Sequence, residues 1–162
     1  MSSQLTHINN KGQARMVDIG QKPDAERSAT AKGEVITSQS TFELIRQGAI
    51  KKGDVLTVAE LAGVMAAKRT SDLIPLCHPL PLTHIDVSVI LDNELPGIQI
   101  QATVKTIGKT GVEMEALVAV SVAALTVYDM VKAVQKTVRI QNIRLVEKHG
   151  GMSGDIVNEG QE

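Results

Sequence analysis

The order of helix and strand signals along the chain constrains its fold more than any other feature of the sequence. Three segments carry a hydroxyl residue with Glu three positions later: Ser40-x-x-Glu43, Thr57-x-x-Glu60 and Thr110-x-x-Glu113. This spacing is the capping box, in which hydroxyl and carboxylate oxygens accept hydrogen bonds from the free N–H groups at a helix N-terminus. The three boxes therefore predict three helices.

The three predicted helices differ in length and in polarity. The first spans about 41–47 and is followed by Gly48, because glycine best adopts the left-handed conformation after a helix C-terminus. The second spans about 58–70 and must end before Pro75, since helical backbone is disfavoured ahead of proline. The third spans from 111 or 112 to about 136 and is apolar on nearly every side.

Apolar residues at every second position mark the strands. Apolar and polar residues alternate over 85–91 and again over 98–104, and a turn-forming stretch, 92–97, separates the two runs. This arrangement predicts a β-hairpin in which one face of each strand carries apolar side chains.

Two further strands are predicted outside the hairpin. The stretch 27–37 alternates small apolar residues with polar ones, and residues 16–19 are a candidate short strand before it. After the third helix, residues 138–145 also alternate, but the phase of the alternation slips. Because a slip of one residue turns side chains to the other face of a sheet, we expect a bulge or kink near Asn142.

The predicted order from residue 27 onward is strand, two helical pieces, strand, strand, helix and strand. This is the split βαβ pattern with its first helix broken into two. We expect an α+β fold, a ferredoxin-like sandwich with a four-stranded antiparallel sheet and helices packed on one face. A chain of this length fits one domain, so 1–162 is expected to be a single domain with mobile polar tails at 1–14 and 149–162.

The third helix has more apolar surface than a helix needs to cover one sheet face. We expect its additional face, which carries Val120, Val127 and Val134, to form an interface between subunits. The alternative is a helix buried on all sides within one domain.

The apolar content is almost entirely aliphatic, which limits what the chain can recognise. Phe42 and Tyr128 are its only aromatic residues, and neither lies in a predicted strand. RNA-binding domains of this topology stack bases on aromatic side chains of the sheet. The formal net charge of −1 also lacks the surplus of Lys and Arg that binding to a phosphate backbone requires. We therefore expect no nucleic-acid partner, although one local basic pocket is compatible with this charge.

Cysteine usage and the length of the apolar segments predict the compartment. The single cysteine, Cys77, rules out an internal disulfide, and its neighbour His78 is too close in sequence for both side chains to reach one ion. No apolar segment follows a basic start, and the uncharged apolar stretch 116–128 is shorter than the roughly 20 residues of a membrane span. We expect a cytoplasmic protein with neither a membrane partner nor a metal site.

The segment 68–82 is the most unusual in the sequence. Two adjacent cations, Lys68 and Arg69, precede an apolar run with three prolines, which fix φ and remove backbone donors. His78 in such a stiff loop can act as a general acid or base near neutral pH. The alternative is a structural histidine bonded to the backbone, and the two cations are also favoured at a helix C-terminus by the helix dipole.

A second group of polar residues shares one stripe of the third predicted helix. At about 100° per residue, Glu115, Asp129 and Lys132 fall on this stripe. Asp129 and Lys132 are helical neighbours, and partial desolvation in so apolar a helix would suit the pair to proton transfer or to holding phosphate. The alternative is an exposed ion pair of little consequence. Glu115 is either functional or an ordinary first-turn acid.

Four longer motifs carry a resemblance to one enzyme family. They are Ile74-Pro-Leu-Cys-His-Pro-Leu80, Gly108-Lys-Thr-Gly-Val-Glu-Met-Glu-Ala-Leu117, Ser121-Val-Ala-Ala-Leu-Thr-Val-Tyr-Asp-Met130 and Lys132-Ala-Val-Gln-Lys136. Together they resemble the MoaC family, the cyclic pyranopterin monophosphate synthases of molybdenum cofactor biosynthesis. The likeness extends from Leu5-Thr-His-Ile-Asn9 to Gly150-Gly-Met-Ser-Gly-Asp155, so it covers nearly the whole chain.

The resemblance implies an enzyme, a lyase of the phosphorus–oxygen type. Its substrate would be a cyclised dihydro-GTP made from GTP by a radical SAM cyclase, and its products cyclic pyranopterin monophosphate and pyrophosphate. The resemblance also implies a homohexamer, a trimer of dimers with the pocket at a dimer interface. No cofactor is implied beyond a divalent ion such as Mg²⁺ that would accompany the triphosphate.

The resemblance further implies roles for individual residues. Asp129 matches the catalytic acid or base of the family, and Lys132 and Lys52 match its essential cations. Our hypothesis is that Asp129 positions Lys132, which works with Lys52 from a neighbouring subunit. The substrate-binding segments of the family match three loop residues, Leu76, Cys77 and His78, and two helix residues, Met114 and Glu115. Weaker candidates, for binding the triphosphate, are three cations: Arg27, Lys68 and Arg69.

One departure and one alternative accompany the resemblance. Where the family more often has Lys or Arg, this chain has Met152, so the carboxy-terminal loop is left out of the candidate site. The alternative function is a non-catalytic module of the same fold that senses a small metabolite at a subunit interface. A sensor needs no polar pair within an apolar helix, and the pair formed by Asp129 and Lys132 therefore favours the enzyme.

Overall fold

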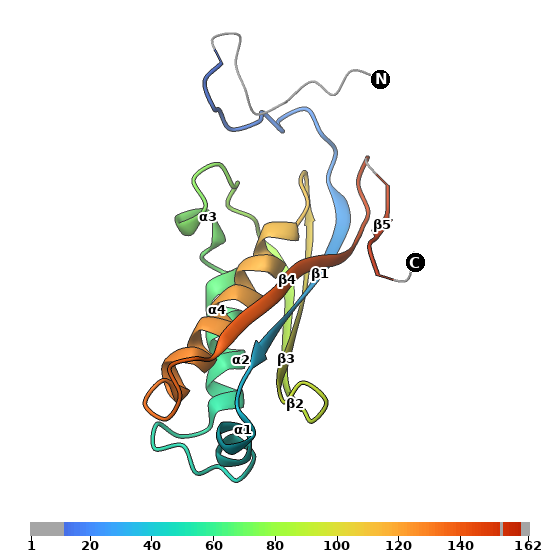
Figure 1. Ribbon diagram of the computed structural model, residues 1–162. Helices are drawn as coiled ribbons and strands as arrows, with labels where there is room; N and C mark the ends of the chain where they lie inside the picture. Colours follow the sequence, from blue (N-terminus) through green and yellow to red (C-terminus); the bar gives the residue numbers. More distant parts are fainter. Residues whose placement is uncertain (1–11, 153, 160–162) are drawn as a thin grey trace.

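One antiparallel sheet with helices on a single face makes up the body of the chain (Figure 1). The computed structural model describes residues 12–152 and 154–159. The elements in chain order are β1 (Ala25–Ile36), α1 (Gln39–Arg46), α2 (Val55–Ala67), α3 (Thr70–Leu73), β2 (Leu82–Asp92), β3 (Gly97–Gly108), α4 (Glu113–Val131), β4 (Arg139–His149) and β5 (Ile156–Val157). The strand order across the sheet is β2-β3-β1-β4-β5.

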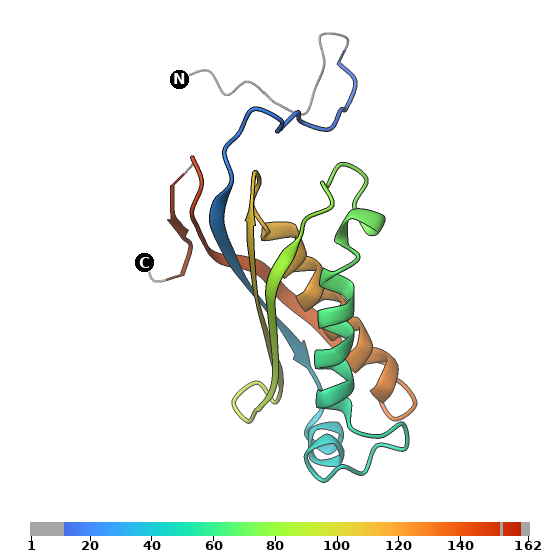
Figure 2. The same ribbon diagram turned by 180° about the vertical axis from the view of Figure 1, so that it is seen from behind.

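The central strand β1 pairs with β3 on one side and with β4 on the other, both antiparallel. The predicted hairpin is confirmed as β2 and β3, in which Val87 lies opposite Ala102 and Val89 opposite Ile100. These four side chains are buried under α2 and α4, as the period-two alternation requires. Figure 2 shows both helices lying side by side on this face of the sheet.

The long helix α4 packs closely on β1 because β1 carries small residues on that face. A Cβ added to Gly33 would lie 2.7 Å from Cγ1 of Val120 on α4. Val120 and Val127 are both fully buried within their own chain. The prediction that they form a subunit interface is therefore wrong, and of the three valines only Val134 is exposed, by 54%.

Part of the apolar surface that the described chain leaves exposed lies on α2. Val58, Leu61 and Met65 recur there at helical spacing, with 42%, 60% and 50% of their surfaces exposed, and Leu125 on α4 is 58% exposed. By length and composition alone α4 could cross a membrane, but most of it is buried, and the core helix of a globular protein passes the same test. The burial of α4 against the sheet and α2 explains its apolar composition.

The helices begin at other residues than the capping boxes predicted. The α1 cap is Ser38, whose hydroxyl accepts from the N–H of Thr41, and the α2 cap is Asp54. The Asp54 carboxylate accepts from two backbone N–H groups and from the hydroxyl of Thr57, so it replaces Thr57 as the cap. At α4 the cap position is Val112, which makes no side-chain cap. Gly48 has a φ of +65°, which confirms its predicted role after α1.

The ends of two helices also differ from the prediction. The second helix ends at Ala67, and the residues that follow form the separate short helix α3. The third ends at Val131 rather than near 136. No strand forms at 16–19, so that prediction is also wrong.

The predicted irregularity near Asn142 is confirmed. Asn142 has a φ of +54°, and the pairing of β1 with β4 shifts register between Lys32 and Glu34. A second shift lies between Thr30 and Ala31. The extra residues on β4 bend the strand and restore its apolar side chains to the covered face.

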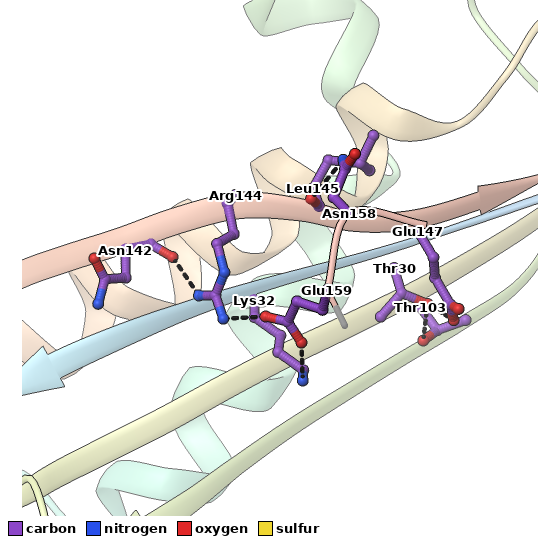
Figure 3. A network of polar contacts seen from close by, with 9 residues as sticks. All are labelled: Thr30, Lys32, Thr103, Asn142, Arg144, Leu145, Glu147, Asn158 and Glu159. Atoms are coloured by element: carbon purple, nitrogen blue, oxygen red, sulfur yellow. Dashed lines mark hydrogen bonds and ion pairs between the residues drawn. The ribbon is translucent and has the colours of Figure 1, made fainter. Parts of the chain in front are cut away.

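The sheet has five strands, one more than predicted. The added strand, β5, lies within the expected tail 149–162 and pairs with β4 through Val157 and Ile156. Glu159 follows it on the uncovered face of the sheet, where its carboxylate contacts Arg144 and lies 2.7 Å from Nζ of Lys32 (Figure 3). Part of the expected tail is therefore strand. The amino-terminal tail up to residue 11 lies outside the described residues.

Candidate active site

The predicted site residues fall into two groups at opposite ends of α4. Glu115 lies in its first turn and Asp129 in its last, so about 21 Å of helix axis separates them at 1.5 Å per residue. The loop that follows α3 lies at the amino-terminal end, and the loop that precedes α2 lies at the other (Figure 1). One chain therefore presents two separate clusters.

Three charged side chains form the cluster at the carboxy-terminal end of α4. One carboxylate oxygen of Asp129 lies 2.6 Å from Nζ of Lys132, and the other lies 2.6 Å from Nζ of Lys52. Lys52 also donates to the backbone carbonyl of Asp129, at 2.8 Å. Lys52 makes these contacts within its own chain. Our hypothesis placed Lys52 on a neighbouring subunit, and the structure does not require this.

The electrostatics of this cluster keep Asp129 ionised. Hydrogen bonds from Lys132 and Lys52 lower the pKa of Asp129 to about 2, and the carboxylate raises the pKa of Lys132 in return. All three side chains are about half exposed. The expected desolvation of the pair is therefore absent. One carboxylate thus holds two ammonium groups in place, and these can bind an anionic ligand.

A cavity of about 280 Å³ lies at the amino-terminal end of α4. It is lined by all five of the residues predicted for the substrate-binding loop and helix: Leu76, Cys77, His78, Met114 and Glu115. The stiff proline-rich loop supplies the first three, and the start of α4 supplies the other two. The structure thus brings together two segments that are far apart in the sequence.

Glu115 is a buried carboxyl in the wall of this cavity, with 4% of its surface exposed. Burial raises its pKa, and the neighbouring charge of Glu113 adds to the rise. Burial also raises the pKa of the Cys77 thiol, as does the charge of Glu115. A thiol with a raised pKa is a poor nucleophile, so Cys77 is suited to packing rather than to covalent chemistry.

His78 is anchored to the backbone, as the structural interpretation predicted, and also lines the cavity. Its Nε2 lies 2.9 Å from the carbonyl oxygen of Val17. A neutral ring that donates from Nε2 leaves Nδ1 as an acceptor. The contact therefore fixes both the orientation and the tautomer of the ring.

The three weaker candidates are dispersed. Arg27 donates from Nε to the carbonyl of Gly108, at 2.8 Å, and from Nη2 to that of Lys109, at 3.2 Å. It lines a second, larger cavity of about 450 Å³. Lys68 and Arg69 are exposed after the end of α2, and in the described part of the chain neither lines the two cavities.

Comparison with known proteins identifies the family. The sequence matches the MoaC family over residues 16–151. The chain belongs to the MoaC family. It is 59% identical over 155 residues (96% of this chain, 98% of the relative) to a cyclic pyranopterin monophosphate synthase of Heliobacterium modesticaldum. A protein of the same name from Roseiflexus sp. is 58% identical over 157 residues (97% and 99%), and one from Nostoc sp. is 57% identical over 154 residues (95% and 92%).

Sequence reasoning missed several residues around the smaller cavity of this MoaC-family chain. Lys22 lines it, as does Glu113, which was expected to serve only as a helix cap. Glu113 instead forms a largely buried ion pair with Lys148 of β4, at 2.9 Å. Lys109 donates to the carbonyl of Gly20, at 2.7 Å, and so ties the segment before β1 to this end of α4. The Gly-Lys-Thr-Gly stretch at 108–111, which belongs to one of the four motifs, is a sequence signal for this region.

No resident metal site is visible within the range that the structure describes. Among residues 12–152 and 154–159, no three His, Cys, Asp or Glu side chains are grouped as metal ligands. A divalent ion that arrives with a triphosphate would take its other ligands from phosphate and water.

Proposed function

We propose that this chain is a cyclic pyranopterin monophosphate synthase. It converts (8S)-3',8-cyclo-7,8-dihydroguanosine 5'-triphosphate to cyclic pyranopterin monophosphate and releases pyrophosphate, as a lyase of molybdenum cofactor biosynthesis. The observation that carries the proposal is the identity of 57–59%, over at least 95% of the chain, to relatives with this name. A radical SAM cyclase supplies its substrate.

The smaller cavity is suited to the purine-derived ring. It offers Met114 and Leu76 for apolar contact and His78 and Glu115 for polar contact at the ring edge. Neither Phe42 nor Tyr128 of the same chain lines this cavity, so one chain offers no Phe or Tyr for stacking there. A Glu115 carboxyl with a raised pKa can donate a hydrogen bond when protonated and accept one when ionised.

The cluster at the other end of α4 is suited to the phosphate chemistry. Lys52 and Lys132 can neutralise the charge that develops on departing pyrophosphate, and either ammonium can donate a proton. Asp129 has a pKa of about 2 and stays ionised at neutral pH. We therefore assign Asp129 to the catalytic group as the carboxylate that holds the two cations, rather than as the group that carries a proton by itself.

The separation of the two clusters supports a site built from two copies of the chain. The ring cavity of one copy would face the charged cluster of another, within a homohexamer arranged as a trimer of dimers. The exposed apolar residues Leu61, Met65 and Leu125 supply surface that self-association would bury. The strand order β4-β1-β3-β2, with β5 added at the edge, supports a ferredoxin-like sandwich. We also expect the enzyme to work in the cytoplasm.

The direct test supplies the purified enzyme with the cyclised dihydro-GTP. We expect the pterin product and pyrophosphate in equal amounts, and loss of turnover in a Lys132→Ala variant whose circular dichroism spectrum shows that it is folded. Binding of the substrate without either product would overturn the proposal and favour the metabolite-sensing module. Normal turnover by folded Lys132→Ala would remove the charged cluster from the mechanism.

A further inference from the structure

We infer that His149 is a positioning residue for Arg27. Held between two carboxylates, its imidazolium keeps the turn at Gly150 and Gly151 packed against the Arg27 guanidinium. The inference rests on the proposed function and on the expectation, implied by the family resemblance, that Arg27 binds part of the triphosphate. It adds to the site a segment that sequence reasoning had left out.

Both ring nitrogens of His149 face carboxylate oxygens. Nδ1 lies 3.1 Å from Oδ2 of Asp155, and Nε2 lies 3.3 Å from Oε2 of Glu147. A neutral imidazole can donate from only one nitrogen, so both contacts are hydrogen bonds only in the imidazolium form. The geometry therefore favours the cation.

The two carboxylates are themselves held in place. The second oxygen of Glu147 accepts from the Thr30 hydroxyl, at 3.2 Å, and Thr30 in turn contacts the Thr103 hydroxyl, at 3.0 Å (Figure 3). The second oxygen of Asp155 accepts from the N–H of Gly150, at 2.9 Å. His149 thus links the end of β4 to both sides of the turn that follows it.

The turn packs closely against β1, and its backbone conformation favours glycine. Gly150 and Gly151 have φ values of +86° and +81°. A Cβ on Gly150 would clash with the carbonyl oxygen of Glu26, and a Cβ on Gly151 would clash with Nη1 of Arg27. The guanidinium is therefore confined by this turn at Nη1 and by the carbonyls of the loop before α4 at Nε and Nη2.

The charges around His149 set its response to pH. Asp155 and Glu147 raise the pKa of His149 above its usual value. Three more charged groups line the same cavity of about 450 Å³: Glu26 and Arg27 from β1 and Lys105 from β3. The negative charge of Glu26 stabilises the imidazolium form of His149, whereas the positive charges of Arg27 and Lys105 destabilise it.

The sign of the effect follows from the raised pKa. Below the pKa of histidine in the unfolded chain, His149 donates to both carboxylates. One of these two hydrogen bonds is lost as the pH rises through the pKa of His149 in the folded protein. We therefore expect Arg27 to be held less firmly at alkaline pH. Affinity for the phosphate end of the substrate would fall in that range, with little change in the chemical step.

The test compares His149→Gln and His149→Lys with the wild-type enzyme. Loss of a charged hydrogen bond predicts a KM for His149→Gln that is about tenfold higher, with kcat changed less than about twofold. Lysine keeps the positive charge without titrating near neutral pH, so His149→Lys should lack the alkaline rise in KM that we expect of the wild-type enzyme. The control is Glu159→Gln, which breaks the neighbouring contacts to Lys32 and Arg144 and should leave KM and its pH profile unchanged.

A binding measurement separates this inference from the proposed function. Inorganic triphosphate, titrated calorimetrically, should bind about tenfold more weakly to His149→Gln than to the wild-type enzyme. If wild-type enzyme makes no pterin, the proposed function fails while this difference still tests the role of His149. Wild-type KM, pH profile and triphosphate affinity in a folded His149→Gln would overturn the inference. So would an equal shift in Glu159→Gln, because it would indicate a general effect of this sheet edge.

Discussion

At the scale of single residues, Asp129 matters because one exposed carboxylate holds two lysines. The Asp129→Asn variant keeps the size of the side chain but removes the charge that both Nζ atoms contact. We expect kcat to fall about 100-fold or more, because misplaced cations no longer stabilise the developing negative charge. Steady-state kinetics check this. Glu43→Gln, which breaks the exposed i,i+3 pair with Arg46 on α1, is the matched control and should leave kcat unchanged.

The lowered pKa of Asp129 also makes a prediction about stability. The folded pKa of about 2 lies below the ordinary value, so the stabilisation is present above the unfolded pKa and is lost as the pH falls through about 2. The melting temperatures of wild-type enzyme and Asp129→Asn should therefore differ by a constant amount from pH 5 to 8 and converge below about pH 4. A difference that changes between pH 5 and 8 would contradict the ion pairs seen here.

The pKa of Glu115 is raised, whereas that of Asp129 is lowered, because the Glu115 carboxyl is buried. Its raised pKa means that the stability it contributes is greatest at low pH and declines as the pH rises through the folded value. Replacement by Gln in Glu115→Gln should therefore stabilise the protein more at neutral pH than at acidic pH, while it weakens substrate binding. Thermal unfolding between pH 4 and 8 measures the stability. A benefit that is no larger at neutral than at acidic pH would contradict ionisation of a buried carboxyl.

At the scale of the elements, the contact of α4 with β1 depends on the absence of a side chain at Gly33. In Gly33→Ala, the new Cβ would lie 2.7 Å from Val120 and 3.1 Å from Ile143. We expect a loss of about 1–3 kcal/mol from overpacking. Chemical denaturation checks this, and the Gly33→Ala/Val120→Ala double variant should cost less than the two single changes combined. Strict additivity would show that α4 does not press on β1 at this point.

The same elements show how far sequence patterns predict this fold. Period-two alternation predicted β1, β2 and β3 and the irregularity at Asn142, because one buried face dictates each of those patterns. The predicted start of α2 was wrong because Asp54, a stronger acceptor, lies three residues before Thr57 and takes its place. α3 and β5 have four and two residues, which is too short for periodicity to register.

At the scale of the whole molecule, the sequence predicted the members of the site better than their arrangement. Stiff prolines and the Thr110-x-x-Glu113 motif mark the walls of the ring cavity, and helical spacing marks Asp129 with Lys132. Helical spacing already separates Glu115 from Asp129. Nothing in a single sequence, however, indicates that the loop with His78 lies at the amino-terminal end of α4 or that Lys52 reaches Asp129 within one chain. These facts depend on how the helix lies across the sheet, which the motifs alone do not encode.

The separation of the clusters leads to a prediction about assembly that mixing two inactive variants can test. Lys132→Ala damages one end of α4, and His78→Ala damages the other. If each site combines the ends of two chains, some sites in the mixed oligomer contain no substitution. Random assembly of equal amounts should restore about a quarter of the wild-type activity.

The control for this experiment pairs Lys132→Ala with Asp129→Asn. Both changes lie in the same cluster, so every site in that mixture carries a defect whichever way the chains combine, and no activity should return. If the opposite-end pair also stays inactive while size measurements show mixed oligomers, each chain must complete its own site. A motion that brings the two ends of α4 to one ligand would then be required, and the rigid packing of that helix on Gly33 argues against it.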